Sequence, residues 1–220
     1  MSSASARHPL GLVVVCIVEF CERFASLLLS ALLVIYLTEQ QRLGAGDAVR
    51  LAGYLQALGY VAALAGGAVA DRIGYRLTVA AGLAMLLIGF SLLAMGSPRA
   101  ALLAAPAMVV GNGLFKLLVT ALLGTLYRRS DERRGHGFGW FYLTVNIAGT
   151  VAPLAGGMLR TRYGWSAGFG VAAVMVGLGL LTLLIGSAVL QPAGTGEDTD
   201  QPRIPRERHV ARWMAVGGVM

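Results

Sequence analysis

Long apolar runs separated by short polar connections make up most of the chain. A transmembrane helix needs about 20 consecutive, mainly apolar residues, and six runs reach that length. They are Leu10 to Leu37, Leu51 to Ala70, Leu77 to Gly96, Ala100 to Tyr127, Gly137 to Leu159 and Ser166 to Leu190. The pattern predicts an all-α membrane protein in which residues 10–190 form one bundle of six transmembrane helices.

The composition is also that of a chain that spans a lipid bilayer. Of its 220 residues, 56% are hydrophobic and 13% are charged, and the mean hydropathy is +0.69. Soluble domains carry about 25% charged residues, so a soluble enzyme is excluded. The 18 basic and 11 acidic residues form no stripe with interleaved aromatic residues, which argues against nucleic acid as a partner. We expect no enzymatic activity, no cofactor and no metal site.

The basic residues between the runs predict how the bundle is oriented. Eleven of them fall on the side that holds both chain ends and the connections after the second and fourth runs, whereas five fall on the opposite side. Cytoplasmic connections carry the excess of Lys and Arg. We therefore predict a multi-pass protein of the cell membrane, with both termini and the tail of residues 1–9 in the cytoplasm.

The end of the chain differs in composition from the rest. Residues 191–205 are rich in Pro, Gly and acidic side chains, which is typical of a flexible linker, and residues 206–220 change from basic to apolar. We predict that 191–220 is a cytoplasmic linker followed by the start of a truncated further helix. An amphipathic cytoplasmic tail is the alternative.

Charged residues within the apolar runs are the first functional candidates, because a charge in the bilayer costs at least a few kcal/mol. Glu19, Glu22 and Arg23 lie in the middle of the first run. They share one helix face with Ser26 and Ser30. We expect this face to point into the bundle, with partners for Glu22 and Arg23 on a neighbouring helix. The alternative is that Glu22 and Arg23 partly neutralise one another.

Lys116, the only lysine of the chain, is the partner that we expect from the fourth run. Asn112 and Thr120 lie one helical turn to either side and complete a polar stripe. A buried lysine can release its proton, whereas an arginine stays charged, so Lys116 suits a switchable pair with a glutamate. A static ion pair that fixes the helix register is the alternative. Asn146 and Tyr60 are candidates for hydrogen bonding, either in the same cavity or between helices.

The connection between the second and third runs carries a recognisable motif. Its glycines allow a tight turn, and its aspartate and arginines can cap helix ends and pair across an interface. It resembles the G-x-x-x-D-R-x-G-x-R loop of the major facilitator superfamily, which implies that the six helices form the amino-terminal half of that fold. The matching residues are Gly67, Asp71, Arg72, Gly74 and Arg76.

Three more motifs resemble the proton-dependent oligopeptide transporters within that superfamily. E-x-x-E-R-F begins at Glu19, G-L-F-K begins at Gly113, and F-Y with a later asparagine begins at Phe141. The resemblance implies two sets of roles for this chain. They are proton coupling for Glu19, Glu22, Arg23 and Lys116, and substrate binding for Tyr60, Asn146 and Asn112.

The chain departs from these transporters where they usually bind peptides. After E-R-F they have paired tyrosines and an arginine. This chain instead reads A-S-L-L-L-S over residues 25–30, with Ser30 in place of the arginine. Leu117 and Leu118 follow the lysine where these transporters have P-N. A serine cannot form the bidentate contact that an arginine makes with a carboxylate. Proton coupling is therefore better supported than a peptide substrate.

We predict a proton-coupled secondary transporter, a symporter of small peptides or related solutes, of which this chain is the amino-terminal half. Glu22 is the expected proton carrier, because burial favours a neutral carboxyl while a nearby Lys116 favours a charged one. The expected partners are the lipid bilayer, the substrate, and a second six-helix half or an identical copy. The alternatives are a major facilitator transporter of drugs or other solutes, and a non-transporting membrane remnant or scaffold.

Overall fold

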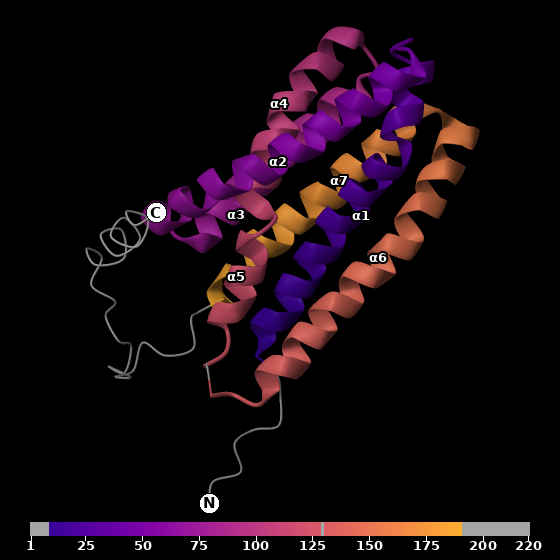
Figure 1. Cartoon of the computed structure of the whole chain (residues 1–220). Coiled ribbons are helices and arrows are strands. Elements are labelled where there is room, and N and C mark those ends of the chain that lie inside the picture. Colours follow the sequence, from indigo (N-terminus) through magenta and orange to yellow (C-terminus); the bar gives the residue numbers. More distant parts are fainter. Residues whose placement is uncertain (1–8, 129, 191–220) are drawn as a thin grey trace, which may run out of the picture.

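The structure, a computed structural model, describes residues 9–128 and 130–190, most of which are helical (Figure 1). The predictions for the cytoplasmic tail before Pro9 and for the linker and truncated helix over 191–220 lie outside the described residues. The elements are α1 (Leu10–Glu39), α2 (Ala45–Ile73), α3 (Tyr75–Ala94), α4 (Pro98–Phe115), α5 (Leu118–Thr125), α6 (Arg133–Tyr163), α7 (Trp165–Ile185) and the 3₁₀-helix η1 (Gly186–Val189).

The predicted six-helix membrane bundle is confirmed. Five helical stretches within the described ranges are long and apolar enough to cross a membrane, namely α2, α3, α4 with α5, α6, and α7 with η1. The sixth is α1, which has 30 residues. At 1.5 Å per residue it is longer than the roughly 30 Å hydrocarbon core of a bilayer, and it lies within the same bundle.

The fourth span differs from the prediction, because it is interrupted. We expected one continuous helix from Ala100 to Tyr127, but α4 ends at Phe115 and α5 begins at Leu118. Pro106, which lacks a backbone N–H and disfavours a helix interior, lies inside α4 without ending it. The break instead places Lys116 at the end of a helix.

The helices differ strongly in how much of their surface the bundle covers. α1 packs against α6 and α7, α3 packs against α4 and α7, and α2 packs mainly against α4. In Figure 1, α6 runs along one edge of the bundle, away from α2 and α4. In the most apolar stretches of α2 and α6 only 17% of the residues are buried, against 39–44% in the other three candidate spans. α2 and α6 therefore present large uncovered surfaces.

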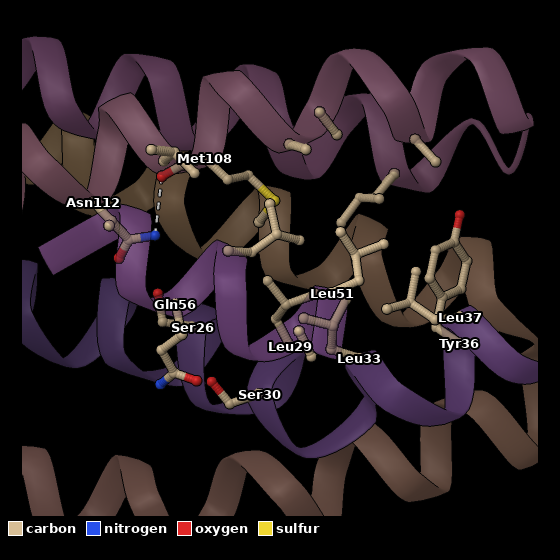
Figure 2. A pocket seen from close by; sticks show the side chains of 18 of the residues that line it. Ser26, Leu29, Ser30, Leu33, Tyr36, Leu37, Leu51, Gln56, Met108 and Asn112 are labelled. Atoms are coloured by element: carbon tan, nitrogen blue, oxygen red, sulfur yellow. Dashed lines mark hydrogen bonds between the residues drawn. The ribbon is translucent and has the colours of Figure 1, made fainter. Parts of the chain in front are cut away.

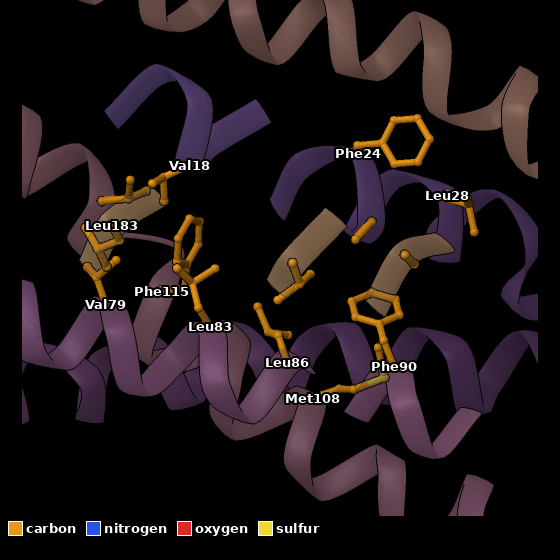
Figure 3. Close-up of a cluster of buried hydrophobic side chains, with 14 of the residues drawn as sticks. Val18, Phe24, Leu28, Val79, Leu83, Leu86, Phe90, Met108, Phe115 and Leu183 are labelled. Atoms are coloured by element: carbon orange, nitrogen blue, oxygen red, sulfur yellow. The ribbon is translucent and has the colours of Figure 1, made fainter. Parts of the chain in front are cut away.

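The core lies where α1, α3, α4 and α7 meet (Figure 3). Without a hydrophobic driving force between helices in lipid, close packing holds such a core together. Its fully buried side chains include Leu28, Leu83, Leu86, Phe90 and Phe115.

Glycines bring α4 into backbone contact with both of its neighbours. A Cβ atom on Gly113 would lie 2.7 Å from the backbone of Ala62 in α2, and one on Gly66 would collide with the carbonyl oxygen of Gly113. On the opposite side, a Cβ atom on Gly82 of α3 would lie 3.0 Å from the carbonyl oxygen of Gly111. Small residues are what allow transmembrane helices to approach this closely.

The connection from α2 to α3 is a single residue, which confirms the predicted tight turn. Gly74 has φ = +88°, a region that glycine adopts without steric cost. The Thr78 hydroxyl donates to the Gly74 carbonyl oxygen at 2.9 Å. The turn therefore reverses the chain, so that α2 and α3 both pack mainly against other helices, and each of them against α4.

Candidate functional site

Two glutamates of α1 lie inside the bundle beside one arginine. Glu19 and Glu22 are each only 1% exposed. Arg23 Nε donates to Glu19 Oε1 at 2.6 Å and lies 3.7 Å from Glu22 Oε2. Ser26 Oγ donates to Glu22 Oε1 at 2.6 Å. These four residues share one helix face, and we call them the carboxylate cluster.

The carboxylate cluster holds more acceptors than its donors satisfy. Two carboxyl groups share one guanidinium, and Glu19 Oε2 and Glu22 Oε2 are buried without a hydrogen-bond donor. An unpaired buried charge is strongly unfavourable. A proton bound by either carboxyl removes the excess negative charge, so the arrangement is chemically suited to proton binding and release.

The expectation that a neighbouring helix pairs with Glu22 and Arg23 is wrong for the described residues, where Arg23 instead lies beside both glutamates of its own helix, as in the alternative. Arg23 lies four residues after Glu19, a spacing that brings the two side chains together on the same helix. Lys116 is not paired with a glutamate either. Its Nζ atom lies 3.9 Å from the centroid of the Tyr60 ring on α2, which is a cation–π contact.

The carboxylate cluster borders a cavity of about 420 Å³ between α1, α2 and α4. Arg23 and Lys116 both line it. Figure 2 shows that polar side chains gather at one end of the cavity and leucines at the other, next to Tyr36. The polar end carries Ser26, Ser30, Gln56 and Asn112, and the apolar end carries Leu29, Leu33, Leu37 and Leu51. The cavity is therefore amphipathic, with two cationic residues in its wall.

The predicted substrate-binding residues are only partly brought together. Asn112 lines the cavity with Lys116, and its side-chain amide donates to the Met108 carbonyl oxygen at 3.0 Å. Asn146 lies on the exposed surface of α6 and donates to the Tyr142 carbonyl oxygen at 2.9 Å. Tyr60 does not line this cavity and is 54% exposed, although its ring contacts Lys116.

The predicted loop residues are mostly helical. Gly67, Asp71 and Arg72 belong to α2, and Arg76 belongs to the first turn of α3. Asp71, Arg72 and Arg76 are exposed. The expected capping and ion pairing by these three side chains is not found in the part of the chain that the structure describes. Only Gly74 forms the turn itself.

A second ion pair, between Glu39 and Arg160, escaped the sequence analysis. Arg160 near the end of α6 donates to the carboxylate of Glu39 at the end of α1. The Arg160 guanidinium also lies 4.9 Å from the ring centroid of Trp165. Both charged residues lie just beyond the apolar runs on the same predicted side, which was the available signal. We call this contact the end pair.

A comparison with known protein families shows to which family the chain belongs. The model of the POT family matches residues 76–202, more than half of the sequence. The chain belongs to the POT family. The uncharacterized transporter YclF of Bacillus subtilis is 36% identical over 185 residues, which are 81% of this chain and 38% of that protein. Dipeptide and tripeptide permease A of Salmonella typhimurium is 31% identical over 188 residues, which are 84% of this chain and 37% of that protein.

Solved structures agree with this assignment. The crystal structure of a peptide transporter POT in complex with sulfate has a TM-score of 0.81 at 33% identity and covers 97% of this chain and 45% of that chain. A POT family transporter in complex with 5-aminolevulinic acid has a TM-score of 0.79 at 27% identity. The chain spans less than half the length of these relatives. The bundle is the amino-terminal portion of the major facilitator fold, as predicted.

Proposed function

We propose that the chain is the amino-terminal half of a proton-coupled secondary transporter of small peptides or related solutes. The observation that carries the proposal is the carboxylate cluster, in which two buried glutamates share one arginine at the wall of an amphipathic cavity. Relatives described as peptide transporters and as a dipeptide and tripeptide permease support the solute class.

A second bundle completes the transporter in this proposal. In this fold the substrate lies near the middle of the membrane between two six-helix bundles that rock against each other. The uncovered surfaces of α2 and α6 suit a second six-helix half or an identical copy. The excess of basic residues on one side favours cytoplasmic termini. Cysteine labelling with impermeant reagents tests this orientation, since a cysteine beside Arg99 should react in intact cells and one beside Arg134 should not.

Proton binding changes how Arg23 is shared. With Glu22 charged, the Arg23 guanidinium is attracted by both glutamates, whereas with Glu22 neutral it pairs with Glu19 alone. Because Arg23 lines the cavity, the change reaches the substrate site. Lys116 adds a positive charge to the same wall, which suits a solute with an anionic group.

Replacing the proton carrier tests the function directly. In proteoliposomes that contain this chain together with a carboxy-terminal half, an inward proton gradient should drive solute accumulation that a protonophore abolishes. Glu22→Gln should abolish this accumulation, because glutamine keeps the shape but cannot bind the proton. Exchange of labelled for unlabelled substrate without a gradient should persist. Accumulation by the Glu22→Gln carrier would contradict the proposal, whereas accumulation by vesicles with this chain alone would show that an identical copy supplies the second bundle.

The cavity wall favours a second candidate, a carrier of solutes that are not bound through a peptide carboxylate. Ser30 lies at the polar end of the cavity (Figure 2) and offers a hydroxyl where a guanidinium would form two charge-assisted hydrogen bonds. Dipeptides should therefore compete weakly for uptake, and Ser30→Arg should strengthen their competition about tenfold or more, as expected for one charged hydrogen bond. Tight dipeptide competition without the substitution would favour ordinary peptides.

A further inference from the structure

The buried carboxyl of Glu22 is joined by one hydrogen bond to a residue that lines the cavity. Its Oε2 atom is buried without a hydrogen bond and faces Arg23 Nε at 3.7 Å. Its Oε1 atom accepts the hydrogen bond from Ser26 Oγ at 2.6 Å. Ser26 lines the cavity, whereas Glu22 does not. A proton that arrives from cavity water therefore reaches the Ser26 hydroxyl before it reaches Glu22.

The two side chains between Glu22 and the cavity differ in what they can pass on. A hydroxyl donates one hydrogen bond and accepts others, so it can receive a proton on one side and release one on the other. The Arg23 guanidinium has donors only and keeps its protons. Ser26 is thus the contact of Glu22 whose chemistry allows proton transfer.

The other ionisable groups around Glu22 do not offer a second route. They are Arg23, Glu19 and the thiols of Cys16 and Cys21 on α1, Lys116 at the end of α4 and Tyr60 on α2, and none of them donates a hydrogen bond to Glu22 in the described ranges. α5 and α7 contain no ionisable residue, α3 has them only in its first turn, and the stretch of α6 from 138 to 159 has Tyr142 alone. Glu19 has no hydroxyl contact, since its Oε1 atom is covered by Arg23 and its Oε2 atom is buried.

We propose that Ser26 relays protons between the cavity and Glu22, so that protons enter the carboxylate cluster at Glu22 and not at Glu19. A hydronium ion in the cavity gives a proton to Ser26 Oγ while the Ser26 hydroxyl proton passes to Glu22 Oε1. The products are water, an unchanged serine and a neutral carboxyl, and the reverse transfer releases the proton. The proposal rests on the proposed function in one respect, that Glu22 carries the proton.

A pair of equally shaped side chains at position 26 tests the relay. Threonine keeps the hydroxyl, whereas valine replaces it with a methyl group and leaves no room for a substituting water. In the full chain in lipid nanodiscs, the infrared carboxyl band that disappears in Glu22→Gln reports protonation of Glu22 after a rapid drop in pH. Ser26→Val should slow its appearance at least about tenfold, while Ser26→Thr should stay within about twofold of the unmodified chain.

A matched control removes a hydroxyl elsewhere on α1. Thr38 donates to the carbonyl oxygens of Val34 and Ile35 and does not line the cavity, so Thr38→Val should leave the rate unchanged. If circular dichroism shows that Ser26→Val is unfolded, Ser26→Ala, which adds no bulk, is measured instead. It should also slow the appearance of the carboxyl band.

The outcomes separate the relay from the proton carrier. Equal rates for the variants with and without the hydroxyl would overturn the relay and leave Glu22 as the carrier. A carboxyl band that does not respond to pH in the unmodified chain would overturn both. A slow band in Ser26→Val with a normal one in Ser26→Thr supports the relay.

Discussion

Two glutamate–arginine contacts of α1 have nearly the same chemistry and opposite surroundings. The Glu19–Arg23 contact lies on one helix, with side chains 1% and 18% exposed, whereas the end pair joins α1 to α6 with side chains 49% and 27% exposed. The buried contact includes a second glutamate and leaves two carboxylate oxygens without donors. The end pair therefore links two helices, whereas the buried contact holds the proton-binding groups of a single helix together.

Removing Arg23, the counter-charge of the two buried glutamates, should have the largest effect on stability. Arg23→Gln leaves two buried carboxyl groups without their counter-charge, which in proteins costs about 3–5 kcal/mol. We expect this loss in the free energy of unfolding, measured by denaturation in detergent micelles. Adding Glu19→Gln and Glu22→Gln to the same chain should restore most of it. An Arg23→Gln chain as stable as the unmodified one would show that the glutamates carry no charge that needs Arg23.

Keeping the charge but changing its shape should have an intermediate effect. Lysine presents a compact ammonium at the end of a flexible stem, in place of the Nε–H of Arg23 that contacts Glu19 at 2.6 Å and faces Glu22 at 3.7 Å. Arg23→Lys should therefore lower the free energy of unfolding by about 1–3 kcal/mol, roughly one hydrogen bond to a charged group. The same denaturation experiment measures it. A loss as large as that of Arg23→Gln would mean that geometry alone, and not charge, stabilises the carboxylate cluster.

Breaking the end pair should have the smallest effect. Exposed ion pairs contribute about 0.2–1 kcal/mol and are screened by salt, so Glu39→Gln should change stability by no more than that, and less in high salt. Arg160→Gln should cost more than Glu39→Gln, because it also removes the contact with the Trp165 ring. Equal losses for the two substitutions would show that the ring contact contributes nothing.

The sequence predicted the fold well because membrane spans leave a long and simple signal. Five of the six predicted apolar runs are each covered by one helical stretch, apart from a few residues at the ends, and the fourth is covered by α4 and α5. The break after Phe115 could not be foreseen, since Lys116, Leu117 and Leu118 include no glycine or proline. Nor does Pro106 mark it, because a proline inside a transmembrane helix is tolerated when neighbouring groups compensate.

For the site, the residues were easier to predict than their contacts. Charges inside a membrane are rare, so Glu19, Glu22, Arg23 and Lys116 were conspicuous. The contacts of Arg23 with Glu19 and of Ser26 with Glu22 follow the four-residue spacing of a helix. The contact of Lys116 with the Tyr60 ring depends on how α2 and α4 cross, and short-range spacing does not give that.

The glycine crossings of α4 also determine where this protein can change in evolution or in the laboratory. With backbone against backbone at Gly113 and Gly111, α4 has no freedom to accept larger side chains on the faces that meet α2 and α3. Libraries aimed at a new solute should leave these crossings fixed. Their diversity belongs at the wall positions Ser30 and Gln56, where the cavity offers room. The tightest contacts of the bundle thus confine adaptive change to the opening beside them.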